Sequence, residues 1–174
     1  MAPRVRARQG FTLVELLIVV AIVGILAAIA IPNLLLAVQR AKQKRTMSDI
    51  RTIAGAWEAR ATDVNAFNAA GWTALIPLSI SGLGTALTPT YVRSLPDVDG
   101  WGNSFHAFTD TAWGANPPAG RYQVASYGRN GQPEASTPPG PTTAFDCDIV
   151  YENGQFLVWP EGTQTDKPQA EETP

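Results

Sequence analysis

The chain has few of the residues that form most enzyme sites. Among its 174 residues it contains one cysteine, Cys147, and one histidine, His106. A single cysteine excludes an internal disulfide, and one histidine with one cysteine excludes a zinc cluster of the usual composition. The sequence also lacks a GxSxG nucleophile motif, a phosphate-binding loop motif and a dinucleotide fingerprint. We therefore expect a protein that catalyses no reaction.

Charge is nearly absent from the segment that follows the first ten residues. Residues 11–31 hold one charged side chain, Glu15, among 21 residues that are otherwise almost all apolar. As a helix they would extend about 31 Å, which is enough to cross the hydrocarbon core of a bilayer. A carboxylate inside such a span costs about 2.5–3.5 kcal/mol, so it needs a partner. The preceding residues 1–10 carry three arginines and no acid.

Cleavage of the chain after Gly10 would create that partner. The new amino group of Phe11 is a cation about one helical turn from Glu15, in its own chain or in a staggered neighbour. In a medium of low dielectric constant this amine can neutralise the carboxylate. The pattern therefore predicts identical helices that pack side by side, each satisfying the next.

The order Gly10, Phe11 and Glu15, followed by the apolar run and Pro32, resembles the class III signal and N-terminal helix of type IV pilins and pseudopilins. The resemblance implies that a prepilin peptidase removes the leader, residues 1–10, and methylates the amino group of Phe11. It also implies that Glu15 guides assembly into a helical filament. Pro32 predicts a bend, and the resemblance implies local melting there. A conventional secretory signal and a plain membrane anchor are the alternatives, but neither explains Glu15.

Beyond Pro32 the apolar residues recur at spacings of three and four, which predicts one face of a continuous amphipathic helix. We expect residues 11–38 to form a transmembrane or filament-core helix and residues 39–64 to form its amphipathic second half. Glycine and proline number 15 and 14 in the chain, and they are concentrated in its second half, where they indicate turns. Residues 65–160 are expected to form a globular head.

Segments of alternating apolar and polar residues predict strands in this head at residues 104–109, 121–127, 147–151 and 155–159. A short helix is expected separately at residues 85–92. The last two strands flank Asn153 and Gly154, a dipeptide that strongly favours a hairpin turn. The expected fold class is therefore α+β, with a long N-terminal helix packed on a small antiparallel sheet of about three or four strands. The tail, residues 161–174, has no large apolar side chain and is expected to be disordered.

Two segments of the head carry a narrower resemblance. Residues 91–105 resemble the segment that opens the sheet in major pseudopilins of type II secretion, although Gly100 and Ser104 stand where proline is usual. Trp101, within this segment, is expected to be a core aromatic. Residues 126–149 resemble the calcium-binding region of the same proteins.

The second resemblance implies a calcium ion held by Asp146, Asp148 and Asn130, of which Asn130 stands where aspartate is common. Two carboxylates two residues apart, approached by loop carbonyls, suit a hard cation with roughly six to eight oxygen ligands. If Cys147 points inward on a strand, both aspartates share the other face. The alternative is that they are solvated or cap the long loop at residues 132–144.

Charge is segregated along the chain. Residues 40–60 contain six cations and two acids, whereas residues 62–174 contain four cations and twelve acids. The basic residues 40–60 could form a solvated helix face. Alternatively they could contact the acidic heads of neighbouring subunits or anionic lipid. Because the head is acidic and has no stripe of basic and aromatic residues, nucleic acid is not an expected partner.

We interpret the chain as a self-assembling structural subunit. The resemblance favours the major pseudopilin of a type II protein secretion system. A type IV pilin that forms a surface fibre is the alternative, and an exported soluble enzyme or binding protein is a remote one. The implied partners are further copies in a helical homopolymer, the prepilin peptidase, an inner-membrane assembly platform with minor pilin-like subunits, and membrane lipid before assembly. The expected location is the bacterial inner membrane, as a single-pass precursor with its head outside the cytoplasm, and then a periplasmic or surface filament.

Overall fold

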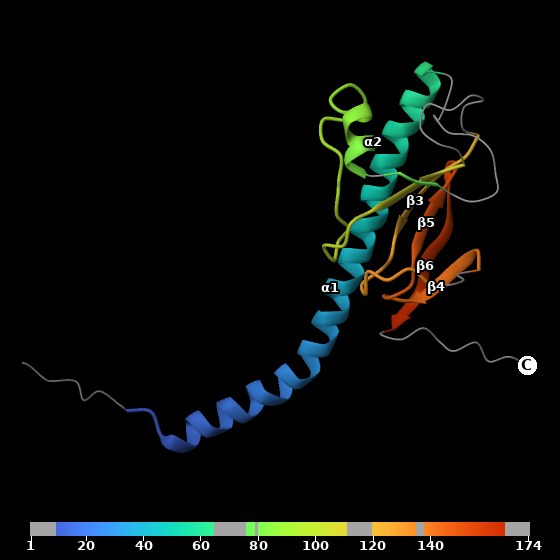
Figure 1. Ribbon diagram of the computed structural model, residues 1–174. Helices are drawn as coiled ribbons and strands as arrows, with labels where there is room; N and C mark the ends of the chain where they lie inside the picture. The colour runs from blue at the N-terminus through green and yellow to red at the C-terminus, as the bar shows by residue number, and fades with distance from the viewer. Residues whose placement is uncertain (1–9, 65–75, 79, 111–119, 135–137, 166–174) are drawn as a thin grey trace, which may run out of the picture. The chain divides into compact units, whose positions relative to one another are not determined.

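The computed structural model describes residues 10–64, 76–78, 80–110, 120–134 and 138–165 (Figure 1). Their contacts divide the chain into two compact units, Met1–Val38 and Gln39–Pro174. One helix, α1 (Leu13–Val64), contributes residues to both units. The predicted leader up to residue 9, residues 65–75 and the end of the tail at residues 166–174 lie outside the described residues.

The first unit contains the apolar half of α1. Apart from Leu36, which is partly buried, its large apolar side chains from Phe11 to Val38 are between 43% and 81% exposed, and the helix is long and apolar enough to cross a membrane. Pro32 lies within α1 and has no N–H group to donate, and the side-chain amide of Asn33 donates to the carbonyl oxygen of Ile29 at 3.1 Å. This apolar surface has no cover within the described chain, so it requires lipid or other subunits.

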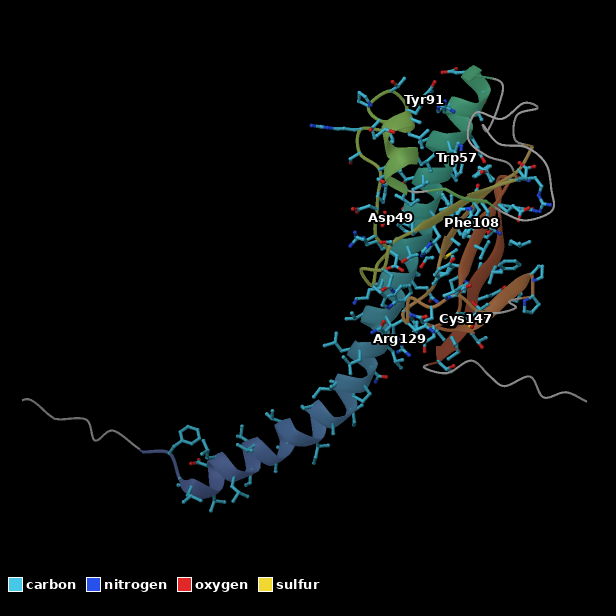
Figure 2. All side chains as sticks on the ribbon, viewed as in Figure 1. Asp49, Trp57, Tyr91, Phe108, Arg129 and Cys147 are labelled. Carbon is cyan, nitrogen blue, oxygen red and sulfur yellow. The ribbon has the colours of Figure 1, made fainter. Side chains whose placement is uncertain are left out.

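In the second unit the other half of α1 lies against a sheet, and α2 (Ile80–Leu87) packs on the same core (Figure 1). Trp57 lies on the half of α1 that runs along the sheet (Figure 2) and is fully buried. Its ring centroid is 4.9 Å from that of Tyr122. Each large side chain that is fully buried stabilises the fold by about 1.5–3 kcal/mol. The core combines both helices with the sheet and includes Ile50, Ile53, Trp57, Leu83, Leu87, Phe105, Tyr122, Val124 and Ile149.

The sheet has six strands: β1 (Ile76–Leu78), β2 (His106–Thr109), β3 (Tyr122–Ser126), β4 (Gly140–Ala144), β5 (Ile149–Glu152) and β6 (Gln155–Thr165). They lie in the order β1-β2-β3-β5-β6-β4. All neighbours pair antiparallel except β4, which pairs with β6 in parallel. Asn153 and Gly154, at φ values of 45° and 93°, form the predicted turn between β5 and β6.

The predicted α+β fold, a long helix on a small sheet, is confirmed, but the sheet is larger than predicted and mixed. The alternating pattern of the sequence does not predict β1 or β4. β4 lies in the proline- and threonine-rich segment expected to be a loop. It is a strand because it pairs in parallel with β6, and this pairing between distant segments leaves no periodic pattern in the sequence of β4. The short helix spans residues 80–87 rather than 85–92, because Leu83 and Leu87 face the core together.

The prediction of a disordered tail is wrong for its first five residues. Residues 161–165 belong to β6, and Gln164 is only 5% exposed. The side-chain amide of Gln164 donates to the carbonyl oxygens of Thr142 and Glu161 at 2.9 Å each, and its oxygen accepts from Gln43 at 3.1 Å. Hydrogen bonds of a buried glutamine hold this segment, so its composition gives no sign of its order.

Candidate functional site

Glu15 lies in a capping box at the start of α1. Thr12 precedes the first helical residue, and Glu15 is the third residue of the helix. The backbone N–H and the hydroxyl of Thr12 donate to Glu15 Oε2 at 2.9 and 2.7 Å, and the Glu15 N–H donates to Thr12 Oγ1 at 3.2 Å. This reciprocal arrangement satisfies two backbone donors that the helix itself cannot pair.

Glu15 therefore has a partner in its own chain, which an argument from charge alone overlooks. The spacing Thr-x-x-Glu is a signature of the capping box and would have identified Thr12 from the sequence. No described residue donates to the other carboxylate oxygen, Oε1. The amide and hydroxyl of Thr12 survive cleavage after Gly10, so the mature chain can keep the box and offer Oε1 to another cation. Pairing of Glu15 with the amine of Phe11 stays a prediction.

The turn before β5 holds two of the three residues expected to bind calcium. β5 begins at Ile149, two residues later than the strand predicted for residues 147–151, so Asp146 and Asp148 both precede the observed strand. Both oxygens of Asp146 accept hydrogen bonds from the guanidinium of Arg129, at 2.8 and 2.9 Å. Figure 2 shows Arg129 close to Cys147, at the end of the head where this turn lies.

Asp148 lies in a different environment from Asp146. It is 7% exposed, its Oδ2 accepts the backbone N–H of Glu134 at 3.2 Å, and its Oδ1 is buried without a hydrogen bond from the described residues. The prediction that the two aspartates share one strand face is therefore wrong, because the chain turns between them. Burial, together with the charge of Glu134, raises the pKa of Asp148 to about 6. Burial and Glu134 also raise the pKa of the Cys147 thiol to about 11, so Cys147 is protonated at neutral pH.

These contacts do not fit a shared calcium site. The oxygens of Asp146 already bind a cation that repels a divalent ion. Asn130 is exposed, and its side-chain oxygen accepts the backbone N–H of Gln132 at 2.9 Å. Only Asp148 keeps an unused oxygen, whereas calcium takes roughly six to eight oxygen ligands. In the part of the chain that the structure describes, no group of three or more His, Cys, Asp or Glu side chains could hold a metal ion. Calcium binding stays an untested prediction.

A buried carboxylate connects this loop region to the segment at residues 97–105. Asp99 is 2% exposed, and its Oδ1 accepts the backbone N–H groups of Trp101 and Asn103 at 2.8 and 2.9 Å. Its Oδ2 accepts the hydroxyl of Ser126 at 2.7 Å. The side-chain amide of Asn103 in turn donates to the carbonyl oxygen of Gly128 at 2.8 Å. The residues that carry the narrower resemblance thus form one hydrogen-bonded unit.

The same segment is docked on α1 at Gly100. Its N–H donates to Thr46 Oγ1 at 2.9 Å, and a Cβ atom at this position would lie 2.3 Å from the carbonyl oxygen of Lys42. Glycine is required for so close an approach of two backbones. Trp101 packs at the edge of the core, and its Nε1 donates to Gln39 Oε1 at 2.7 Å.

A helix of membrane length with a capped glutamate at its start, whose second half packs on a small sheet, defines the class of pilin-like filament subunits. Comparison with known proteins supports this class. Residues 5–31 match the family model of the prokaryotic N-terminal methylation motif. The chain is also 53% identical over 45 residues to the type IV major pilin protein PilA of Myxococcus xanthus. This match covers 26% of the chain and 20% of PilA.

Longer matches identify the family. The chain is 32% identical over 130 residues to the type II secretion system core protein G of Pseudomonas aeruginosa, covering 72% of this chain and 89% of that protein. It is 31% identical over 113 residues to the protein of the same name from Aeromonas hydrophila, with coverages of 63% and 78%. The chain therefore belongs to the family of type II secretion system core protein G, the major pseudopilins, which confirms the function favoured from the sequence. No solved structure matches the chain significantly.

Proposed function

We propose that the chain polymerises into a periplasmic filament that pushes folded cargo outward during type II secretion. The observation that carries this proposal is the apolar half of α1, where 17 large apolar side chains between Phe11 and Val38 are 43–81% exposed. Lateral packing of identical helices in a filament would cover these side chains, as lipid would before assembly. Such a subunit works through its surfaces and needs no catalytic residues.

Before assembly the precursor stands in the inner membrane, with residues 11–38 as its span and its head outside the cytoplasm. The prepilin peptidase removes residues 1–10 and methylates the new amino group. Gly10 and Phe11 are exposed, as a cleavage site must be.

Cations follow the span at the height of the lipid headgroups. Arg40, Lys44 and Arg45 are exposed and lie within two helical turns of Val38. At about 1.5 Å per residue they stand roughly 3–11 Å beyond the apolar surface, where lipid phosphates lie. Contact with anionic lipid would hold the subunit at a fixed depth until it leaves the bilayer.

Assembly depends on Glu15. In a single chain Thr12 donates to Oε2, and Oε1 remains open. In the filament the Phe11 amine of a neighbouring subunit binds Oε1, which neutralises the carboxylate where few water molecules remain. The assembly platform and the minor pilin-like subunits present each new subunit for this step.

Two substitutions at Glu15 separate its charge from its capping role. Both Glu15→Gln and Glu15→Ala should insert in the membrane at least as well as the wild type, because each removes an expensive charge. Glutamine can still accept the hydrogen bonds of Thr12, whereas alanine cannot. If the charge pairs with the Phe11 amine, both variants lose filaments, measured as the yield of sheared filaments from the native host. Wild-type yield from Glu15→Gln would contradict the pairing and leave only the capping role.

Processing is tested separately with Gly10→Val. The larger side chain should block the peptidase, so intact mass would show the full precursor without a methyl group. A normally shortened and methylated Gly10→Val chain would contradict the proposed cleavage site.

A further inference from the structure

An ion pair joins the loop at residues 127–132 to the turn at residues 145–147. Arg129 Nε and Nη2 donate to the two oxygens of Asp146 at 2.8 and 2.9 Å, so the pair is bidentate. Both side chains are partly buried, at 30% and 24% exposure. The guanidinium carbon also lies 6.0 Å from the ring centroid of Phe145, and the Arg129 N–H donates to the Phe145 carbonyl oxygen at 2.9 Å.

The two backbones beneath this pair are in direct contact. Gly128 has a φ of 61°, and a Cβ atom at this position would lie 2.5 Å from the carbonyl oxygen of Asp146 and 2.6 Å from that of Cys147. Only glycine allows this approach, and the positive φ also favours it. The ion pair therefore closes a contact between two segments that are already fitted to each other.

We propose that the guanidinium of Arg129 replaces the calcium ion that the family resemblance implies, so that the head of this protein folds without a metal. The role of a calcium ion here would be to bring a positive charge between the loop and the acidic turn. Arg129 brings that charge on the loop itself and directs it at Asp146. This inference goes beyond the proposed function, which does not depend on how the loop is held.

The charges of the surrounding residues agree with this replacement. Asn130 is neutral, so the candidate ligand set contains two carboxylates, and Arg129 already balances one of them. A calcium ion at Asp146 would have to displace a bidentate guanidinium and would leave that cation partly buried without its partner. Asp148 is then the remaining carboxylate of the candidate set, and its Oδ2 already accepts the backbone N–H of Glu134 at 3.2 Å.

Thermal unfolding of the full chain in detergent, in EGTA and in millimolar calcium, tests the proposal. The wild type should unfold at the same temperature in both. Arg129→Met should unfold earlier in both, by on the order of 5 °C, because it leaves Asp146 unpaired. Arg45→Met is the matched control, since it removes an exposed arginine from its ion pair with Asp49 and should change the unfolding temperature little.

A double variant tests the replacement in the opposite direction. Arg129→Ala with Asn130→Asp removes the guanidinium and supplies a third carboxylate at the position that the resemblance assigns to an aspartate. This variant should gain thermal stability on adding calcium but not magnesium, because three carboxylates with loop carbonyls suit the larger ion.

Two results would overturn the proposal. The first is a rise in the unfolding temperature of the wild type with calcium, which needs no variant to measure. The second is an Arg129→Met chain that unfolds no earlier than the Arg45→Met control. If Arg129→Met does not fold, Asp146→Asn provides the second comparison, because it removes the same ion pair and keeps the arginine. Asp146→Asn must then lower the unfolding temperature in EGTA. An unchanged temperature would contradict a stabilising role for the ion pair between Arg129 and Asp146.

Discussion

The two halves of α1 bury apolar surface by different means. In the unit Met1–Val38 the helix is apolar on every side, and a typical residue, Leu26, is 62% exposed. In the unit Gln39–Pro174 only one face is apolar, and it places Ile50 and Trp57 in a core where neither is exposed. The same hydrophobic effect stabilises both halves only if the first half is covered by something other than this chain. The half of α1 from Gln39 onward therefore stabilises the fold of the single subunit, whereas the half up to Val38 requires lipid or other subunits to cover it.

No helix-breaking residue separates the two halves. Pro32 lies inside α1 and well within the apolar half. It leaves a carbonyl oxygen of the preceding turn without its usual N–H donor, and Asn33 adds a side-chain donor to the carbonyl of Ile29 in that turn. The carbonyl that loses its donor is that of Ala28, four residues before Pro32, so the side chain of Asn33 adds a second donor to a different carbonyl and does not replace the missing N–H. The change of surroundings is marked by cations instead, beginning at Arg40.

The largest effect that follows from the comparison is that truncation of a side chain destabilises the head in one half of α1 and leaves its stability unchanged in the other. Trp57→Ala should lower the free energy of unfolding of the head by about 3–5 kcal/mol, since it removes a fully buried side chain that packs on Tyr122. Leu26→Ala should leave that free energy unchanged, since Leu26 is exposed. Denaturant unfolding of both full-length variants in detergent measures this. Equal losses would show that the two halves are not independent.

The sequence predicts the helix and its two halves because periodicity and charge act locally. A run without charge, a carboxylate near its start and spacings of three and four are visible in any window of the chain. The hairpin at Asn153 and Gly154 is predictable for the same reason, since the turn depends on two adjacent residues.

The parts that the sequence does not predict depend on partners far along the chain. β4 forms because β6 offers it a parallel edge, and Gln164 is ordered by Gln43, which lies 121 residues away. Arg129 follows the same rule, because its role is defined by Asp146, 17 residues further along the chain. The pattern of aspartates in the sequence predicts a metal site, whereas nothing local to Arg129 predicts its ion pair.

A smaller effect is expected from adding a methyl group at two glycines of the packed unit. Gly100→Ala should destabilise the head by about 1–3 kcal/mol, because the new Cβ would meet the rigid backbone of Lys42 at 2.3 Å. Gly55→Ala is the control within α1: it is exposed, nothing lies within 4 Å of its Cβ position, and a stabilisation of up to about 1 kcal/mol is expected. Denaturant unfolding measures both.

Gly100→Pro sharpens this test, since proline is usual here in the resembling pseudopilins. Proline adds the same clash and also removes the N–H that donates to Thr46. It should therefore destabilise this head more than alanine does. A Gly100→Pro head as stable as the wild type would show that the segment can move away from α1 at little cost.

The smallest effect concerns pH, and it should arise in the packed unit alone. Burial, with the charge of Glu134 nearby, raises the pKa of Asp148 to about 6 from an unfolded value of about 3.9. Between these two pKa values the folded head binds a proton that the unfolded chain releases. The contribution of Asp148 to the free energy of unfolding is therefore fully present below about pH 4 and is lost as the pH rises through about 6. Of the neighbouring groups, Cys147 stays neutral over this range, because burial raises the pKa of its thiol to about 11.

Asp148→Asn isolates this term, because asparagine keeps the shape and an acceptor for the Glu134 N–H but cannot ionise. The variant should lose the fall in unfolding temperature that Asp148 causes between about pH 4 and pH 7, and near pH 7 it should be at least as stable as the wild type. Asp97→Asn, at an exposed carboxylate, is the matched control and should keep the wild-type profile. Thermal unfolding of the full chain in detergent across this range gives the measurement. A profile of Asp148→Asn that parallels the wild type would mean that Asp148 reaches solvent and that the turn before β5 is open. The ion pair between Arg129 and Asp146 in that turn would then stabilise the head less than its geometry indicates.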